Sequence, residues 1–154
     1  MASFRLSHAK YALIPALLMG AGSAQAQTVN LIGTVVNLCV LTISTPGSLA
    51  ISSNGLQLST TNGGLPASLT VVATGSNPTI SFSSPSLVGP SSGGATTEVA
   101  YSSTGGASHA YDSSGYVYAM NRLLDTVTIN GRASNSSGFR SGVYTISATA
   151  TCSQ

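Results

Sequence analysis

The side chains able to do acid–base or nucleophilic chemistry are few in this 154-residue chain. After residue 26 it has one histidine, His109, and three carboxylates, Glu98, Asp112 and Asp125. His109 and Asp112 share one short polar stretch, and serines abound, but no motif places a serine against them. Glycoside hydrolysis needs two opposed carboxylates, and nothing in the spacing of the three acids provides such a pair. We expect a solvated loop histidine, surface acids, no cofactor and no enzyme activity, with a hydrolase as a minor alternative.

The second reactive type is cysteine, present twice, as Cys39 and Cys152. In an exported chain an even pair of cysteines predicts a disulfide, here closing a loop of more than 100 residues. The alternative is two buried free thiols. Zinc ligation is disfavoured because a structural zinc site needs four ligands and only His109 remains to join the two sulfurs. We therefore expect no metal.

Export is predicted by the first 26 residues. A basic start with Arg5 and Lys10 precedes an apolar run at 11–18 and the triplet Ala24-Gln25-Ala26. This order is that of a secretory signal peptide, and the apolar run is too short to span a membrane. We expect cleavage after Ala26, passage through the periplasm, and a secreted or cell-surface protein without a transmembrane segment in the mature chain. The alternative is a buried core helix.

Charge is scarce in the rest of the chain. Without the leader, Arg122, Arg132 and Arg140 balance the three acids, and no lysine is left. A nucleic-acid partner requires a basic surface that neutralises phosphates, which three scattered arginines do not supply. We expect no nucleic-acid partner.

The elements that must position the cysteines are strands. Tyr144, Ile146, Ala148 and Ala150 alternate with polar residues up to Cys152, which indicates a core strand at the C-terminus. The further strands are expected at 28–43, 49–52, 56–59, 68–74, 80–82, 97–102, 116–120 and 125–133, separated by turn-forming residues. Loops are expected at 83–95 and 104–115, and residues 122–125 could form one helical turn. The pattern predicts a single all-β domain over 27–154, an immunoglobulin-like antiparallel sandwich of about eight strands.

The two ends of this domain resemble a known family. The segment GTVVNLC (33–39) follows the leader, and Gly142-Val143-Tyr144 opens the strand that runs to the C-terminus. This arrangement resembles secreted pilins of the spore coat protein U and archaic chaperone–usher type. The resemblance implies an incomplete sandwich completed by a neighbour's N-terminal extension. It also implies a non-enzymatic subunit of a bacterial fimbria, surface fibre or coat active in cell adhesion, which self-assembles or joins related subunits with a periplasmic chaperone and an outer-membrane usher.

Strand exchange would depend on the segment that precedes Cys39. Val29, Leu31 and Val35 are its candidate apolar plugs, with Gly33 where two backbones would approach closely, and residues 27–36 form the candidate donor strand. Only 12 residues separate Ala26 from Cys39, so the domain's own first strand must then begin near Cys39. In the alternative, the segment is the domain's own edge strand. The alternative function is a self-contained secreted sandwich that binds a surface, a glycan or a protein through its loops.

Overall fold

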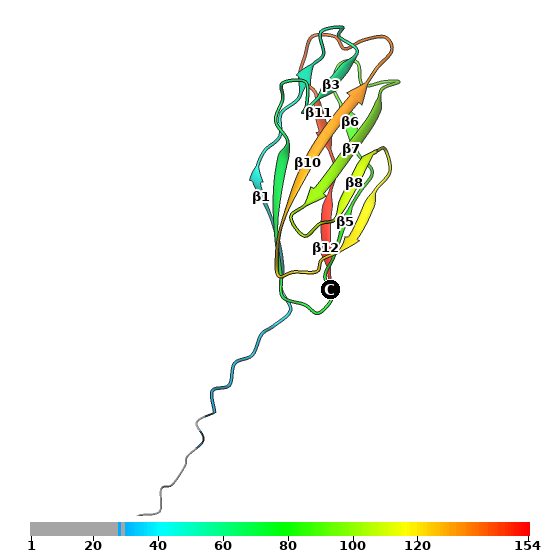
Figure 1. The fold of residues 1–154 in the computed structure, drawn as a ribbon. Helices are drawn as coiled ribbons and strands as arrows, with labels where there is room; N and C mark the ends of the chain where they lie inside the picture. The colour runs from blue at the N-terminus through cyan, green and yellow to red at the C-terminus, as the bar shows by residue number, and fades with distance from the viewer. Residues whose placement is uncertain (1–27, 29) are drawn as a thin grey trace, which may run out of the picture. The chain divides into compact units, whose positions relative to one another are not determined.

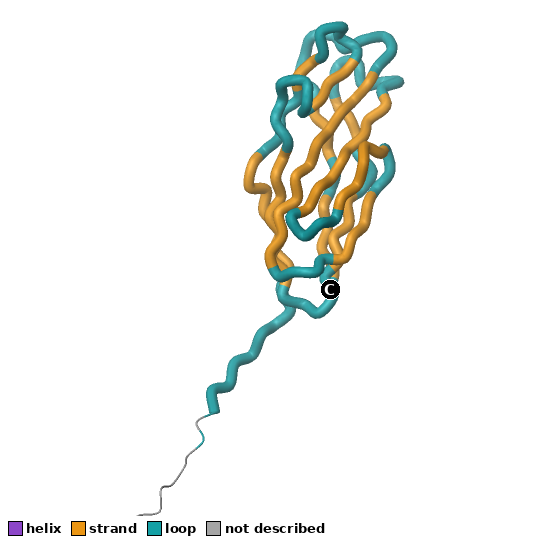
Figure 2. Tube along the Cα trace, in the orientation of Figure 1, coloured by secondary structure: helices purple, strands orange, loops and turns teal. Residues whose placement is uncertain are grey.

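The computed structural model describes residue 28 and residues 30–154. The expected signal peptide, residues 1–26, lies outside the described residues. The chain divides into two units between Gly33 and Thr34, and all the strands belong to the second unit. Figure 2 shows strands and loops only. No helix in the part described here is long and apolar enough to cross a membrane.

Twelve strand segments make up this domain, and every pairing between them is antiparallel. They are β1 (Cys39–Thr45), β2 (Ala50–Ile51), β3 (Gln57–Ser59), β4 (Ala67–Ala73), β5 (Thr79–Phe82), β6 (Ser86–Val88), β7 (Thr96–Ser103), β8 (Ser108–Asp112), β9 (Tyr116–Ala119), β10 (Leu124–Ser134), β11 (Thr145–Ser147) and β12 (Ala150–Ser153). The all-β class predicted from the sequence is confirmed.

The larger sheet is organised around β10, the longest strand (Figure 1). The first half of β10 pairs with β4, its second half pairs with β3, and β7 lies along most of its other edge. Strand β1 extends this sheet beyond β4, and β8 extends it beyond β7. The second layer consists of β12, β5 and β9 in that order, together with the separate β11–β6 pair.

One apolar core joins the two layers. Val71 of β4, Val99 of β7 and Val127 of β10 face Ile80 and Phe82 of β5, and all are buried. Strict alternation puts these side chains on the inner face of each strand, as the inner faces of a sandwich require. The layers therefore share a continuous core, which makes the domain a sandwich.

The sequence missed two strands and misjudged one turn. β6 lies within the expected loop 83–95, and β8 lies within the expected polar stretch 104–115. Residues 122–125 form no helical turn, because Leu124 and Asp125 already pair with β4 as the first residues of β10. The C-terminal strand is divided into β11 and β12, which pair with different partners. The two missed strands and this one division account for the difference between the nine ranges expected and the twelve segments observed.

Candidate functional site

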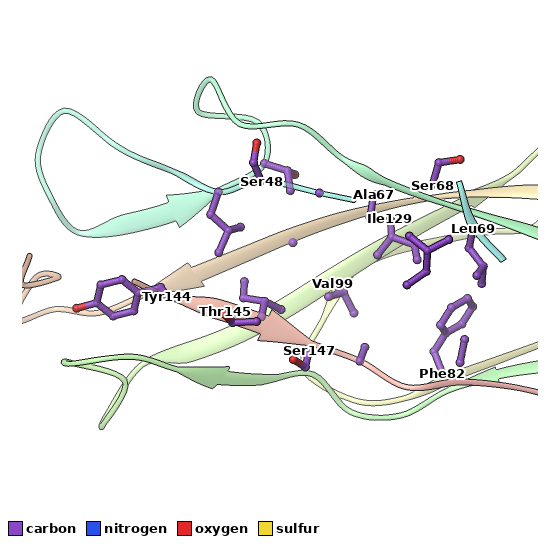
Figure 3. A pocket seen from close by; sticks show the side chains of 18 of the residues that line it. Ser48, Ala67, Ser68, Leu69, Phe82, Val99, Ile129, Tyr144, Thr145 and Ser147 are labelled. Carbon is purple, nitrogen blue, oxygen red and sulfur yellow. The ribbon is translucent and has the colours of Figure 1, made fainter. Parts of the chain in front are cut away.

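A long apolar groove of about 770 Å³ runs between β1 and the C-terminal strands (Figure 3). One wall carries Leu41 and Ile43 of β1. The opposite wall carries Ile146, Ala148 and Ala150, from β11, β12 and the link between them. The groove thus separates the first strand of the domain from its last.

The floor of the groove belongs to the core itself. Leu69, Phe82, Val99 and Ile129 line it, and they come from both layers of the sandwich. Gly131 of β10 also lines it, and a Cβ at that position would lie 3.4 Å from Ile146 Cδ1. The floor is therefore apolar core that the two walls leave accessible.

Both walls end in strand edges without a partner among the described residues. β1 pairs only with β4, β11 only with β6, and β12 only with β5. An unpaired edge presents a row of free backbone N–H and C=O groups, which makes it a template for another strand. The groove therefore offers hydrogen-bonding groups along both sides of an apolar floor.

Strand order shows what belongs there in a complete sandwich. The constant-type immunoglobulin fold has one sheet in the order ABED and another in the order CFG. Here β1, β4, β10 and β7 follow the order ABED, and β5 with β12 corresponds to C and F. No strand among residues 30–154 occupies the position of G, next to β12 and across from β1.

The expected C-terminal core strand lines this groove. Tyr144, Ile146, Ala148 and Ala150 are each half-buried, whereas the residues that alternate with them are exposed. Ile146, Ala150 and Cys152 pack against the core cluster. These inner-facing residues remain half-buried because nothing in the described chain covers them from the groove side.

A disulfide bounds one end of the groove. Cys39 of β1 is bonded to Cys152 of β12, with 6.2 Å between the two Cα atoms. The predicted pairing is therefore confirmed, and the alternative of two free thiols is wrong. At the other end, Tyr144 donates a hydrogen bond to the Arg140 carbonyl (2.9 Å) and shares one with Ser91 Oγ (2.6 Å).

The segment that precedes β1 has no strand partner where it is described. Residue 28 and residues 30–38 carry no strand assignment, and β1 begins at Cys39, so the strand expected at 28–43 is wrong over these residues. Leu31 is 94% exposed and Val35 is 80% exposed. Val29 lies outside the described residues, and Gly33 is exposed.

Thr74 fixes the last residues of this segment. Thr74 Oγ1 donates a hydrogen bond to the Val36 carbonyl (2.6 Å) and accepts one from Leu38 N–H (2.9 Å). Thr74 N–H in turn donates to the Leu38 carbonyl (2.9 Å). Because Thr74 follows β4, these bonds hold residues 36–38 on the β4 side of β1, opposite the groove.

The candidate acid–base residues do not form one site. His109 is not a loop residue: it lies in β8, with its ring stacked 4.3 Å from that of Tyr116. Asp112 is bonded to Ser114, and Glu98 forms an ion pair with Arg132 (2.7 Å) on β10. No group of three or more histidine, cysteine or acidic residues able to hold a metal ion occurs in the described chain.

Asp125 contradicts the expectation of surface acids, because it is only 1% exposed. Its carboxylate accepts hydrogen bonds from Ser103 Oγ, from Thr104 Oγ1 (2.8 Å) and from Gly105 N–H (3.0 Å). Tyr118 OH donates a fourth (3.3 Å). The carboxylate thus ties the β7–β8 turn to β9 and β10.

These contacts determine the ionisation of Asp125. Desolvation by burial raises the pKa of its carboxyl, but the hydrogen bonds from Ser103, Thr104 and Gly105 outweigh it and leave the pKa below the ordinary value. The ionised Asp125 carboxylate therefore has a structural role that composition alone does not reveal.

Burial also raises the pKa of the Tyr101 hydroxyl to about 12.

One sequence pattern matches the spacing of a nucleophile elbow. Residues 89–93 read Gly-Pro-Ser-Ser-Gly, but the elbow requires a turn from a strand into a helix. Here no helix follows, and Ser91 Oγ accepts a hydrogen bond from Arg140 N–H (2.8 Å) besides its bond with Tyr144. Ser91 therefore belongs to the support of Tyr144 at one end of the groove.

Comparison with known proteins found no matching family model, no similar curated protein and no similar solved structure.

Proposed function

We propose that the protein is a structural subunit of a bacterial surface fibre or coat, assembled by β-strand exchange. The observation that carries the proposal is the groove between β1 and β11–β12, with an apolar floor and an unpaired strand edge on each side. The chain also carries an exposed apolar segment immediately before β1, with Leu31, Ile32, Val35 and Val36 all exposed. Within the described residues, no strand occupies the groove and the segment pairs with no strand.

The chemistry of the segment suits the groove. An extended strand bonds through its backbone along both edges, while every second side chain points to the floor. Leu31 and Val35 would then fill apolar positions, and Gly33 would lie between them. Nine residues, 28–36, extend about 30 Å at about 3.3–3.6 Å per residue. The wall from Tyr144 to Ala150 spans seven residues, so the segment is long enough.

The occupant is a second copy of the chain. In each copy Thr74 holds residues 36–38 on the β4 side of β1, away from its own groove. Filling its own groove would require the segment to leave Thr74 and turn around the start of β1. Donation to a neighbour keeps these bonds, and repetition gives a chain of subunits.

Three further features support this assignment. The Cys39–Cys152 disulfide suits an oxidising compartment, such as the periplasm through which the protein would be exported. The balanced formal charge without a leader reduces self-repulsion between subunits. Since the groove would be exposed before assembly, the proposal includes a periplasmic chaperone to cover it and an outer-membrane usher to direct the exchange. Fibre, adhesion and cell-surface location remain parts of the proposal.

Replacing Leu31 by Asp in the mature chain (27–154) tests it. A carboxylate in the apolar floor loses the burial of a leucine, about 1.5–3 kcal/mol, and adds a desolvation cost. We expect at least about hundredfold weaker self-association, read by size-exclusion chromatography. The control is Asn30→Asp, whose side chain points away from the floor and should leave assembly intact. Equal assembly of both variants would contradict strand exchange and favour the self-contained sandwich.

A further inference from the structure

The groove stops at the same level on both walls. On β1 the last lining residue toward the N-terminus is Leu41, and on β12 the last one toward the C-terminus is Ala150. The next inner-facing residues are Cys39 on β1 and Cys152 on β12, which are joined to each other. The disulfide therefore lies across this end of the groove.

Distances show that a strand cannot pass this point. Adjacent strands lie about 4.7–4.9 Å apart, so a strand inserted between two others needs about 9–10 Å between them. The Cα atoms of Cys39 and Cys152 are 6.2 Å apart. The chain has only these two cysteines, so no second disulfide bridges the groove at its Tyr144 end.

We propose that the Cys39–Cys152 disulfide is an end-stop that determines the direction and depth of the inserted strand. The inference rests on the proposed function. The donor enters at the Tyr144 end, which we call the mouth, and its residue 28 end halts at the disulfide. It runs parallel to β1 and antiparallel to β11–β12, with Val35 at the mouth.

This direction places the body of the donor on the mouth of the acceptor. The Val36 carbonyl accepts a hydrogen bond from Thr74 Oγ1, so only the peptide bond between Val35 and Val36 links the inserted strand to the donor domain. Around this point the donor exposes an apolar row across three strands, which we call the base patch: Leu38, Val40, Val72 and Leu124. Val40 faces Val72, and Val72 faces Leu124, on the outer side of the sheet.

The mouth presents matching apolar residues. Val143 is 84% exposed and precedes Tyr144, and Leu65 is exposed beside Ser48, to which its backbone is bonded in both directions. Ser48 and Tyr144 both line the groove. Base patch and mouth are different surfaces, so their contact is heterologous and propagates as a linear fibre.

Fluorescence energy transfer from a tryptophan to a dansyl label determines the direction of the inserted strand in the disulfide-bonded protein. The acceptor is the full mature chain with Leu31→Asp, which cannot donate but retains its groove, and Val143→Trp at the mouth. The protein has no natural tryptophan, so this residue reports alone. The ligand is a synthetic peptide of residues 28–36, labelled with dansyl at either its N-terminal or its C-terminal end.

The end-stop predicts that the C-terminally labelled peptide quenches the tryptophan several-fold more than the N-terminally labelled one. The two labels lie about 30 Å apart on an extended peptide. A reversed order, or equal quenching by both peptides, overturns the end-stop but leaves strand exchange standing. Absence of binding by either peptide overturns strand exchange itself.

The contact between base patch and mouth is tested by Leu124→Asp in the otherwise unchanged mature chain. The control is Val117→Asp, since Val117 of β9 is exposed to a similar extent (59% against 58%) but lies outside the base patch. We expect Leu124→Asp to weaken self-association about tenfold or more, with unchanged binding of the free peptide. Equal self-association of the two variants, or loss of peptide binding by Leu124→Asp, overturns this contact.

Discussion

At the scale of single residues, the composition did not predict that a charged side chain would be buried. Nothing next to Asp125 in the sequence marks it as buried, yet it is enclosed by donors from the end of β7, the β7–β8 turn and β9. The sequence shows only that Asp125 opens an alternating run. Its inward orientation follows from its pairing with Val71 of β4, which is fully buried.

Asp125→Asn is expected to lower the free energy of unfolding by about 2–3 kcal/mol, because the amide NH₂ meets donors where the carboxylate accepted them. Urea denaturation measures the loss. Asp112→Asn is the control and should change stability much less, because Asp112 lies at the end of β8 outside the core and its carboxylate accepts hydrogen bonds from the adjacent turn at Ser114. A loss no greater than that of the control would contradict the role assigned to Asp125.

The pH dependence of the free energy of unfolding, compared between the wild type and Asp125→Asn, tests the same role independently. Because the folded-state pKa of Asp125 lies below its unfolded value, its contribution to stability is complete above the unfolded pKa, about 4. It is lost as pH falls through the folded pKa. Stability of the wild type should therefore fall below about pH 4, and Asp125→Asn should lack this part of the fall. If the stability of the two proteins fell equally with decreasing pH, groups other than Asp125 would cause the loss of stability in acid.

At the scale of elements, the two faces of β1 have different roles. Ile43 lines the groove but is 72% exposed, whereas Thr42 points to the other side of the sheet. The exposure of Ile43 means that the isolated fold gains little from it. Under the proposed function, the Ile43 side chain becomes buried only when a donor strand occupies the groove.

Ile43→Asp should therefore leave thermal unfolding of the unassembled protein within about 0.5 kcal/mol of the parent, as for most surface substitutions. It should nevertheless weaken binding of the 28–36 peptide at least about tenfold, because the carboxylate would be desolvated beside the inserted strand. Isothermal titration calorimetry measures the affinity, and Thr42→Asp is the matched control. Equal affinities of the two variants would remove β1 from the binding site.

The disulfide acts on the same two elements. Replacing both Cys39 and Cys152 by Ser should lower the free energy of unfolding by about 4–5 kcal/mol, because the unfolded chain regains the entropy that closure of a loop spanning 113 residues removes. Denaturation of wild type and double variant under identical conditions measures it. A difference below about 1 kcal/mol would contradict this unfolded-state contribution of the disulfide.

The elements also show how far the sequence leads. Alternation from Tyr144 to Cys152 correctly predicted inner and outer faces, and the cysteine count predicted the disulfide. β6 and β8 were missed because Ser, Pro and Gly dominate the segments around them. These two segments form strands because they pair with β11 and β7, respectively. The resemblance implied an incomplete sandwich, but the residues that line the groove could not be predicted, because they depend on which strand edges remain unpaired once the sandwich has formed.

At the scale of the whole molecule, the proposed function rests on a vacant strand position and on a segment that could fill it in a neighbour. The G position beside β12 has no occupant in the described chain, and the segment before β1 has no strand partner there. Under the proposed function, these two features form a donor end and an acceptor end. These two functions can be removed separately, by Leu31→Asp in the donor and by Ile43→Asp in the acceptor.

Mixing these two full-length mature variants tests strand exchange most directly. Each variant alone should remain a monomer, because one lacks a competent donor and the other a competent acceptor. The 1:1 mixture should form a complex of two chains that cannot grow further, measured by size-exclusion chromatography with light scattering. Monomers in the mixture, or assembly of either variant alone, would contradict the account.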